Sequence, residues 1–109
     1  MLKKRDRLTT KDIENLSLGK SVFGTLLSLR FLAKEKTRIS VSVSKKVFNT
    51  AVKRNKLRRR IYPLVTPFLK EIIVPAHILI MPKKECINAL PSAIQDEIKT
   101  LLNKARLLR

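Results

Sequence analysis

Residues 38–44 read RISVSVS, and residues 51–60 read AVKRNKLRRR. In the first stretch β-branched residues alternate with serines, a pattern typical of a strand with one buried face. The second stretch gathers six basic residues around a single leucine and contains no acidic residue. Both a solvated tail and a helix that lies along phosphates would carry so much like charge. The residues that follow decide between these two interpretations.

The basic stretch continues into an apolar stripe. At about 100° per residue, one sector of a helical wheel holds large apolar side chains, with Val65 at its border. These side chains are Leu57, Ile61, Leu64, Phe68 and Leu69. Such a stripe predicts a folded helix that is anchored to a core. Asn49 or Thr50 is expected to cap it. Pro63 and Pro67 each remove a helical N–H, so a kink or break is expected near residue 62.

The remaining sides of this helix carry its charge. One flank holds Arg54, Asn55, Arg58, Arg59 and Tyr62; the other side of the stripe holds Lys53 and Arg60, with Lys56 further round. Between Lys36 and Lys70 there are eleven basic residues and no acidic one. This arrangement predicts phosphate contacts, to which arginine adds bidentate hydrogen bonds and stacking. Tyr62 is the best candidate for an exposed side chain that stacks on a base.

The serines of residues 38–44 allow two interpretations. Ile39, Val41 and Val43 point to one side of the predicted strand, and the serines point to the other. The serine side is either simply exposed to solvent or a flat floor that lets a polymer approach the backbone closely.

Other segments complete an α+β pattern. A short helix is expected after Thr9 and Thr10, ending near Gly19. Residues 21–33 predict one long strand, or two if it bends, and residues 76–81 (AHILIM) predict a buried central strand. The last helix, within residues 90–108, is expected to begin with a Ser92–Gln95 capping box. The order is helix, two or three strands, basic helix, strand, helix, which predicts a two-layer α/β sandwich.

Composition limits what such a domain can do. The 109 residues suffice for a single domain over 1–109, and the net charge is +17. So large an excess requires a polyanion, with nucleic acid favoured over an anionic membrane surface. No apolar run is long enough to span a bilayer, and no apolar segment follows the basic N-terminus as in a secretory signal. A cytoplasmic location is therefore expected.

Candidate catalytic residues are scarce. The eight acidic residues are scattered without D-x-D or E-x-x-H spacing, and the adjacent pair Asp96–Glu97 is assigned to the first turn of the last helix. His77 is interpreted as structural and Cys86 as a small apolar filler. No metal-ligand set is apparent. Binding is predicted, and catalysis by protein side chains is not.

Residues 42–61, SVSKKVFNTAVKRNKLRRRI, resemble the signature of the protein subunit of bacterial ribonuclease P. Residues 2–8 (LKKRDRL) are similar to the N-terminal signature of that family, and SLRFLA and HILIMPKK fall where two of its strands would be. The resemblance implies a helix-first sandwich like the second domain of ribosomal protein S5, with a left-handed βαβ crossover. It also implies a subunit that binds a catalytic RNA and the 5′ leader of precursor tRNA.

The resemblance further implies that the RNA, with Mg²⁺ bound mainly by RNA, removes the leader, and that the protein supplies no catalytic residue. It implies no cofactor in the protein and no obligate protein partner. The implied RNA-binding residues are Lys3, Lys4, Arg5, Arg7, Lys45, Lys46, Lys53, Arg54, Asn55, Lys56, Arg58, Arg59, Arg60 and Tyr62. A leader cleft between first helix and sheet is implied at Ile13, Leu16, Arg30, Ser42 and Ser44.

The chain departs from the family pattern at this cleft. Ile13 and Leu16 stand where many relatives have phenylalanines, and Arg30 stands where they have a strand tyrosine. Weaker stacking and stronger electrostatics are therefore expected. Two alternative functions are a small basic ribosomal or other structural RNA-binding protein, which its charge and size fit equally well, and a nuclease in its own right, which the missing acid–base set disfavours.

Overall fold

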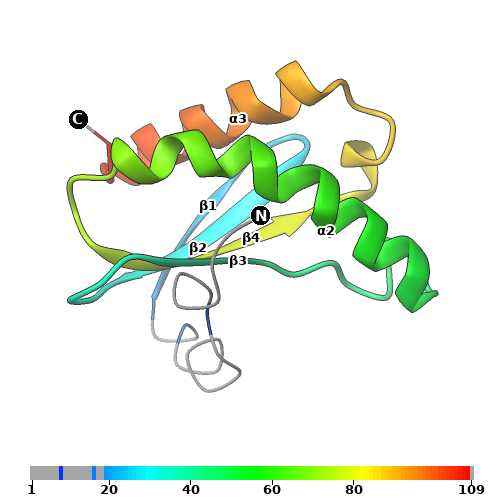
Figure 1. Ribbon diagram of the computed structural model, residues 1–109, viewed down its shortest axis with the longest axis horizontal. Helices are drawn as coiled ribbons and strands as arrows, with labels where there is room; N and C mark the ends of the chain where they lie inside the picture. The colour runs from blue at the N-terminus through cyan, green and yellow to red at the C-terminus, as the bar shows by residue number, and fades with distance from the viewer. Residues whose placement is uncertain (1–7, 9–15, 17–18, 109) are drawn as a thin grey trace.

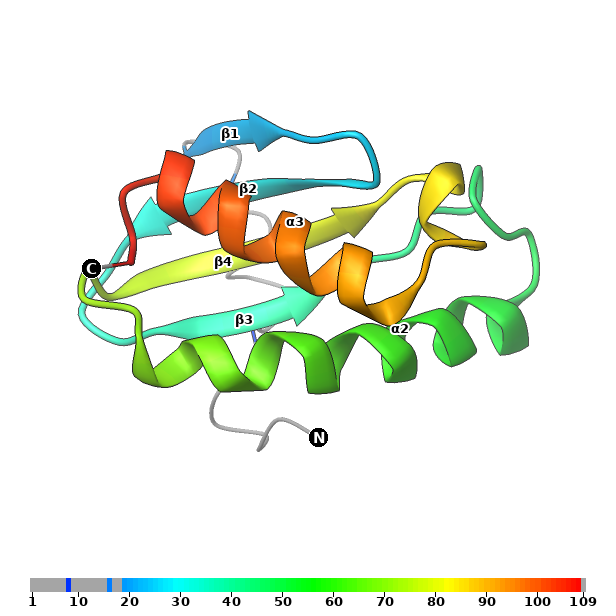
Figure 2. The same ribbon diagram turned by 90° about the horizontal axis from the view of Figure 1, so that it is seen from above.

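A four-stranded sheet carries two α-helices on one face (Figures 1 and 2). The computed structural model describes Leu8, Leu16 and residues 19–108. Its elements are β1 (Lys20–Phe23), β2 (Leu27–Ala33), β3 (Arg38–Val41), α2 (Ala51–Val65), η3 (Thr66–Lys70), β4 (Ala76–Pro82), η4 (Lys84–Cys86) and α3 (Pro91–Lys104). The predicted α+β sandwich is confirmed, while the helix expected after Thr10 lies, apart from Leu16, outside the described residues.

The strand order is β1-β2-β4-β3. β2 pairs antiparallel with both β1 and β4, whereas β3 and β4 pair in parallel, with Arg38 opposite His77 and Val41 opposite Ile80. The parallel pair is joined through α2. Seen from the helix side (Figure 2), α2 lies in front of the sheet, and β4 lies to the left of β3 when the strands point upward. This is a left-handed crossover, the rare hand for such a connection.

The core lies between the sheet and the helices. β2, β3 and β4 send alternate residues toward α2 and α3, and these side chains are almost fully buried: Leu27, Leu29, Ile39, Val41, Ala76, Ile78 and Ile80. β4 also buries residues of its opposite face, since Leu79 packs with Leu8 and Leu16. The prediction of a buried central strand is thus confirmed.

Residues 21–33 form two strands and not one. The chain turns at residues 24–26, so Phe23 is displaced from the apolar alternation and is 68% exposed. Gly24 is needed at this turn because a Cβ there would lie 2.8 Å from the Glu97 carboxyl carbon and 2.9 Å from the Leu27 carbonyl oxygen.

The Glu97 carboxylate holds this turn. It accepts hydrogen bonds from the backbone N–H groups of Thr25, Leu26 and Leu27, each at 2.8 Å. The assignment of Asp96–Glu97 to a helix first turn was wrong, because α3 begins at Pro91. Glu97 instead joins α3 to the β1–β2 turn, 70 residues earlier in the chain.

Two predictions on helix ends also differ from the structure. Leu90 precedes α3, which starts with Pro91 and has no side-chain cap, so the Ser92–Gln95 capping box is wrong. Gln95 Nε2 instead donates to the Leu64 carbonyl oxygen at 3.2 Å and links α3 to α2. Thr50 occupies the N-cap position of α2, again without a side-chain hydrogen bond.

The break expected near Tyr62 lies further along the chain. α2 continues through Pro63 to Val65, and η3 follows with Pro67 near its start, where a missing N–H costs little. Both the backbone N–H and the Oγ1 of Thr66 donate to the Tyr62 carbonyl oxygen. These bonds close the last helical turn although Pro63 lacks a donor.

We expect Glu97→Gln to lower the free energy of unfolding by about 2–3 kcal/mol, because an amide cannot accept from all three N–H groups. Urea denaturation measures this loss. Asp96→Asn makes the same charge change at an exposed neighbour and should change stability by less than about 0.5 kcal/mol. Equal effects of the two variants would show that the turn does not depend on this carboxylate.

Candidate nucleic-acid interface

The buried side of α2 is formed by Leu57, Ile61, Tyr62 and Val65. This buried arc is wider than the stripe predicted from the sequence, because α2 packs against both the sheet and α3. Tyr62 was expected on the exposed flank, but it is only 8% exposed and its hydroxyl accepts a hydrogen bond from the Val41 N–H at 3.1 Å. The prediction that this side chain is exposed is therefore wrong, since a core contact holds it.

A pocket of about 400 Å³ lies where α2 faces the end of β3. We call it the strand-side pocket; it is lined by Leu8, Ser40, Val41, Ser42, Val43, Arg54, Arg58 and Tyr62. The structure thus brings together two of the basic helix residues and one of the expected cleft serines, Ser42. Ser40 is buried and its Oγ accepts a hydrogen bond from the Leu8 N–H at 2.9 Å, so the serine side of β3 is not simply solvated.

Arg54 and Arg58 are held in place within this pocket. Arg54 Nη1 donates to the Phe48 carbonyl oxygen at 2.9 Å, and Arg58 Nη2 donates to Asn55 Oδ1. Arg58 Nε is buried and has no hydrogen-bond partner, the one side-chain atom in this state among the described residues. A buried donor without a partner is costly unless a bound acceptor satisfies it. Because this Nε has no accessible surface, an anion that entered the pocket would meet the other guanidinium N–H groups of Arg54 and Arg58.

Two further hollows lie along the other sides of α2. The outer groove, of about 410 Å³, is lined by Val52, Asn55, Lys56 and Arg59. The α2–η4 pocket, of about 300 Å³, is lined by Phe48, Lys53, Lys56, Leu57, Arg60 and Ile87. All the basic residues expected on this helix therefore line one of three hollows, and none of these hollows contains a carboxylate. Basic side chains therefore line three sides of α2.

The loop between β3 and α2 carries two more of the expected cations. Lys45 and Lys46 are exposed, and Ser44 Oγ accepts from the Lys46 N–H at 3.1 Å within the turn. The Ser42 N–H donates to the Ile80 carbonyl oxygen at 2.9 Å, which continues the strand pairing beyond Val41. Regular β-structure thus ends at Val41, earlier than the serine alternation predicts.

The open face of the sheet, opposite the helices, carries two more of the expected cleft residues, Arg30 and Leu16. Arg30 lies on this face, and its Nε donates to Ser21 Oγ at 3.1 Å. Leu16 is 1% exposed and packs on Leu79, so it forms part of the core and not an open contact surface. The remaining expected residues, Ile13, Lys3, Lys4, Arg5 and Arg7, lie outside the described residues.

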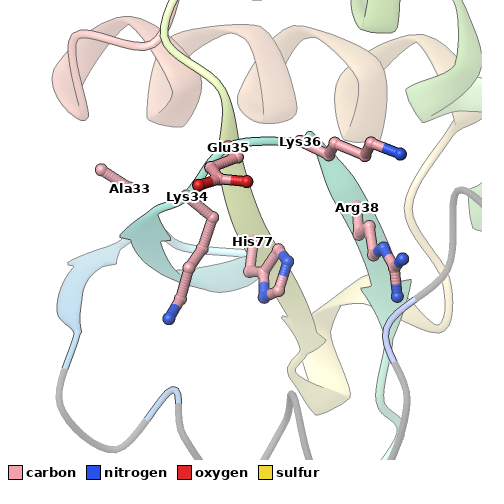
Figure 3. A pocket seen from close by; sticks show the side chains of 6 residues that line it. All are labelled: Ala33, Lys34, Glu35, Lys36, Arg38 and His77. Atoms are coloured by element: carbon pink, nitrogen blue, oxygen red, sulfur yellow. The ribbon is translucent and has the colours of Figure 1, made fainter.

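Sequence reasoning missed a shallow basic hollow at the end of the sheet, beside the β2–β3 turn (Figure 3). It is lined by Ala33, Lys34, Glu35, Lys36, Arg38 and His77. Lys34, Arg38 and His77 extend to the same side of the sheet, since Arg38 and His77 are partners across the parallel strands. Lys34 and Arg38 add two positive charges to the open face beside His77.

Metal-ligating side chains do not gather in the described part of the chain. Within that part no three His, Cys, Asp or Glu side chains gather to hold a metal ion, and no helix there is long and apolar enough to cross a membrane. Cys86 is fully buried in the core, as expected for a filler. Burial raises the pKa of its thiol above the usual value, although the charge of Arg60 opposes the shift.

Tyr62→Phe separates the two roles considered for this residue. We expect it to lower the free energy of unfolding by about 1–2 kcal/mol, because the buried Val41 N–H loses its acceptor. RNA affinity should stay within about twofold, because the ring does not face solvent. Urea denaturation and filter binding on the same preparation measure both. A large loss of affinity with unchanged stability would restore the stacking role.

The chain matches one family model and is similar to several solved structures. A family model described as Ribonuclease P matches residues 2–106. A Staphylococcus aureus RNase P protein mutant with defective mRNA degradation activity superposes with a TM-score of 0.83 at 23% identity, over 96% of this chain and 92% of that one. The RNase P protein from Thermotoga maritima gives a TM-score of 0.78 at 22% identity, over 92% of this chain and 97% of that one.

These structures share the fold of the present chain, whereas a comparison with curated proteins gives no match. The family model covers the basic helix, all four strands and the whole of the final helix. The chain therefore belongs to the ribonuclease P protein family.

Proposed function

We infer that this chain is the RNA-binding subunit of ribonuclease P, that its basic helix α2 binds the catalytic RNA, and that it also binds the 5′ leader of precursor tRNA. The observation that carries the inference is the strand-side pocket, which Arg54 and Arg58 line together without any carboxylate. A phosphate oxygen in this pocket would accept hydrogen bonds from the accessible guanidinium N–H groups and neutralise their charge. Membership of the family supports RNA as the source of the phosphate.

The leader is proposed to run along the open face of the sheet toward the strand-side pocket. Arg30 and the hollow beside the β2–β3 turn supply positive charge there, and Ser42 lines the pocket. Leu16 is buried, so phenylalanine-like stacking from that position is not part of the proposal. Leader binding should therefore depend on phosphate contacts more than on stacking, which makes it sensitive to salt.

Cleavage itself is assigned to the RNA. Mg²⁺ prefers several oxygen ligands, and the described residues offer no cluster of carboxylates for it. His77 is the single histidine of the chain, so one residue would have to act as both general acid and general base. Protein side chains accordingly bind and position the RNA partners, and Mg²⁺ is proposed to be held mainly by RNA.

The purified chain should leave precursor tRNA uncut and should restore cleavage at low Mg²⁺ when a bacterial ribonuclease P RNA is added. The protein lacks an acid–base set but supplies positive charge that low Mg²⁺ does not. Gel analysis of 5′-labelled precursor measures leader release. The RNA alone at low Mg²⁺ is the control. Failure to stimulate any bacterial ribonuclease P RNA, or cleavage by protein without RNA, would overturn the proposal.

Arg54→Ala and Arg58→Ala should each weaken binding to ribonuclease P RNA and reduce the slope of log affinity against log salt by about 0.7–0.9, the contribution of one phosphate. Binding titrations from 50 to 300 mM salt would measure the slope. Lys99→Ala removes one exposed charge from α3 and serves as the matched control. If both arginine variants keep the slope of the control, this flank of α2 does not contact RNA.

A further inference from the structure

The α2–η4 pocket differs from the other basic hollows in having an apolar interior. Phe48 and Ile87 are half-buried and form its walls, while Leu57 lies at the bottom and is 2% exposed. The strand-side pocket and the outer groove offer no aromatic ring other than Tyr62, whose side chain is buried in the core. A flat apolar group can therefore be received at Phe48 and not at the other two hollows along α2.

Cations surround this apolar interior. The Lys53 ammonium lies 5.9 Å from the centre of the Phe48 ring. Arg60 donates to the carbonyl oxygens of Ile87 and Ala89, at 3.3 and 3.5 Å, which fixes its guanidinium at the rim. These two bonds leave further N–H donors of the guanidinium for a ligand. Lys56 adds a third positive charge, and no acidic residue lines the pocket.

We propose that the α2–η4 pocket binds one unpaired nucleotide of RNA, with its base against the Phe48 ring and its phosphate among Lys53, Lys56 and Arg60. A nucleotide is the unit that presents a flat ring and a phosphate together, and base–aromatic stacking beside cations is how single-stranded nucleic acid is held. The pocket volume of about 300 Å³ lies at the small end of the range for ligand pockets, in keeping with a single base.

The position of the pocket supports RNA as the source of the nucleotide. Lys53, Lys56 and Arg60 lie on the opposite side of α2 from Arg54 and Arg58, with the outer groove between the two sides. An RNA that follows the exposed side of α2 would reach this pocket. The inference rests on the proposed function only in taking RNA as the partner, and it adds a second contact that neither Arg54 nor Arg58 provides.

A titration of the labelled chain with adenosine 5′-monophosphate, followed by NMR, tests the pocket. Ribose 5-phosphate carries the same phosphate without a base and is the comparison ligand. We expect shifts at the Phe48 ring and the Ile87 methyl groups, and binding at least about fivefold tighter for the nucleotide. Equal affinities, or shifts confined to the strand-side pocket, would overturn the proposal.

Two variants sharpen this test. Phe48→Leu keeps an apolar wall and should abolish the preference for the nucleotide over ribose 5-phosphate. Lys53→Gln should weaken both ligands, whereas Lys99→Gln, the same substitution at an exposed position of α3, should weaken neither. A retained preference in folded Phe48→Leu protein would overturn the stacking contact. If Phe48→Leu does not fold, the Lys53→Gln and Lys99→Gln pair decides, and equal effects of the two would overturn the proposal.

The source of the nucleotide is tested with a photo-crosslinker on Lys53→Cys, since the native Cys86 thiol is buried. A crosslink to ribonuclease P RNA or to the leader of precursor tRNA supports the proposal and names the source; a crosslink to neither overturns it. The NMR titration uses the chain without RNA, so it is independent of the cleavage assay. Nucleotide binding without stimulated cleavage would contradict the proposed function alone, and the reverse result would contradict the pocket alone.

Discussion

The packing of α2 against the sheet is the contact on which the rest of the molecule depends. Leu57, Ile61 and Val65 pack in the core. The Tyr62 hydroxyl accepts a hydrogen bond from the Val41 N–H of the edge strand β3. Since α2 is also the crossover between the parallel strands β3 and β4, the same packing sets the strand order as well. Without it, the six basic residues of AVKRNKLRRR would repel one another on a free chain.

The packing of α2 on the sheet fixes the positions of its basic side chains. Each basic side chain is attached to a rigid backbone, and several are fixed further by hydrogen bonds to backbone carbonyls, such as Arg54 to Phe48 and Arg60 to Ile87. Ordering a cation before it meets a phosphate removes part of the entropic cost of binding. The repulsion that remains is relieved by a polyanion, which couples the stability of this domain to its RNA partner.

Local patterns predicted the elements well and their ends less well. The alternation in RISVSVS and the apolar run AHILIM identified strands that the structure contains, because strand burial has a period of two that is visible in the chain. The turn at Gly24 was not located, since the Glu97 carboxylate that holds it is distant in sequence. Tyr62 was placed on the wrong side of the helix because the wheel does not show how many neighbours enclose it.

By itself the sequence determined the class of the fold, the amphipathic basic helix, the polyanionic partner and the resemblance to ribonuclease P proteins. Each of these depends on residue type and short-range spacing. Tertiary structure alone decided which cations share a pocket, that Arg58 Nε is left without a partner, and that Phe48 and Ile87 meet beside Arg60. Those features join segments that are far apart in the chain, and only the packing of α2 on the sheet brings them within contact distance.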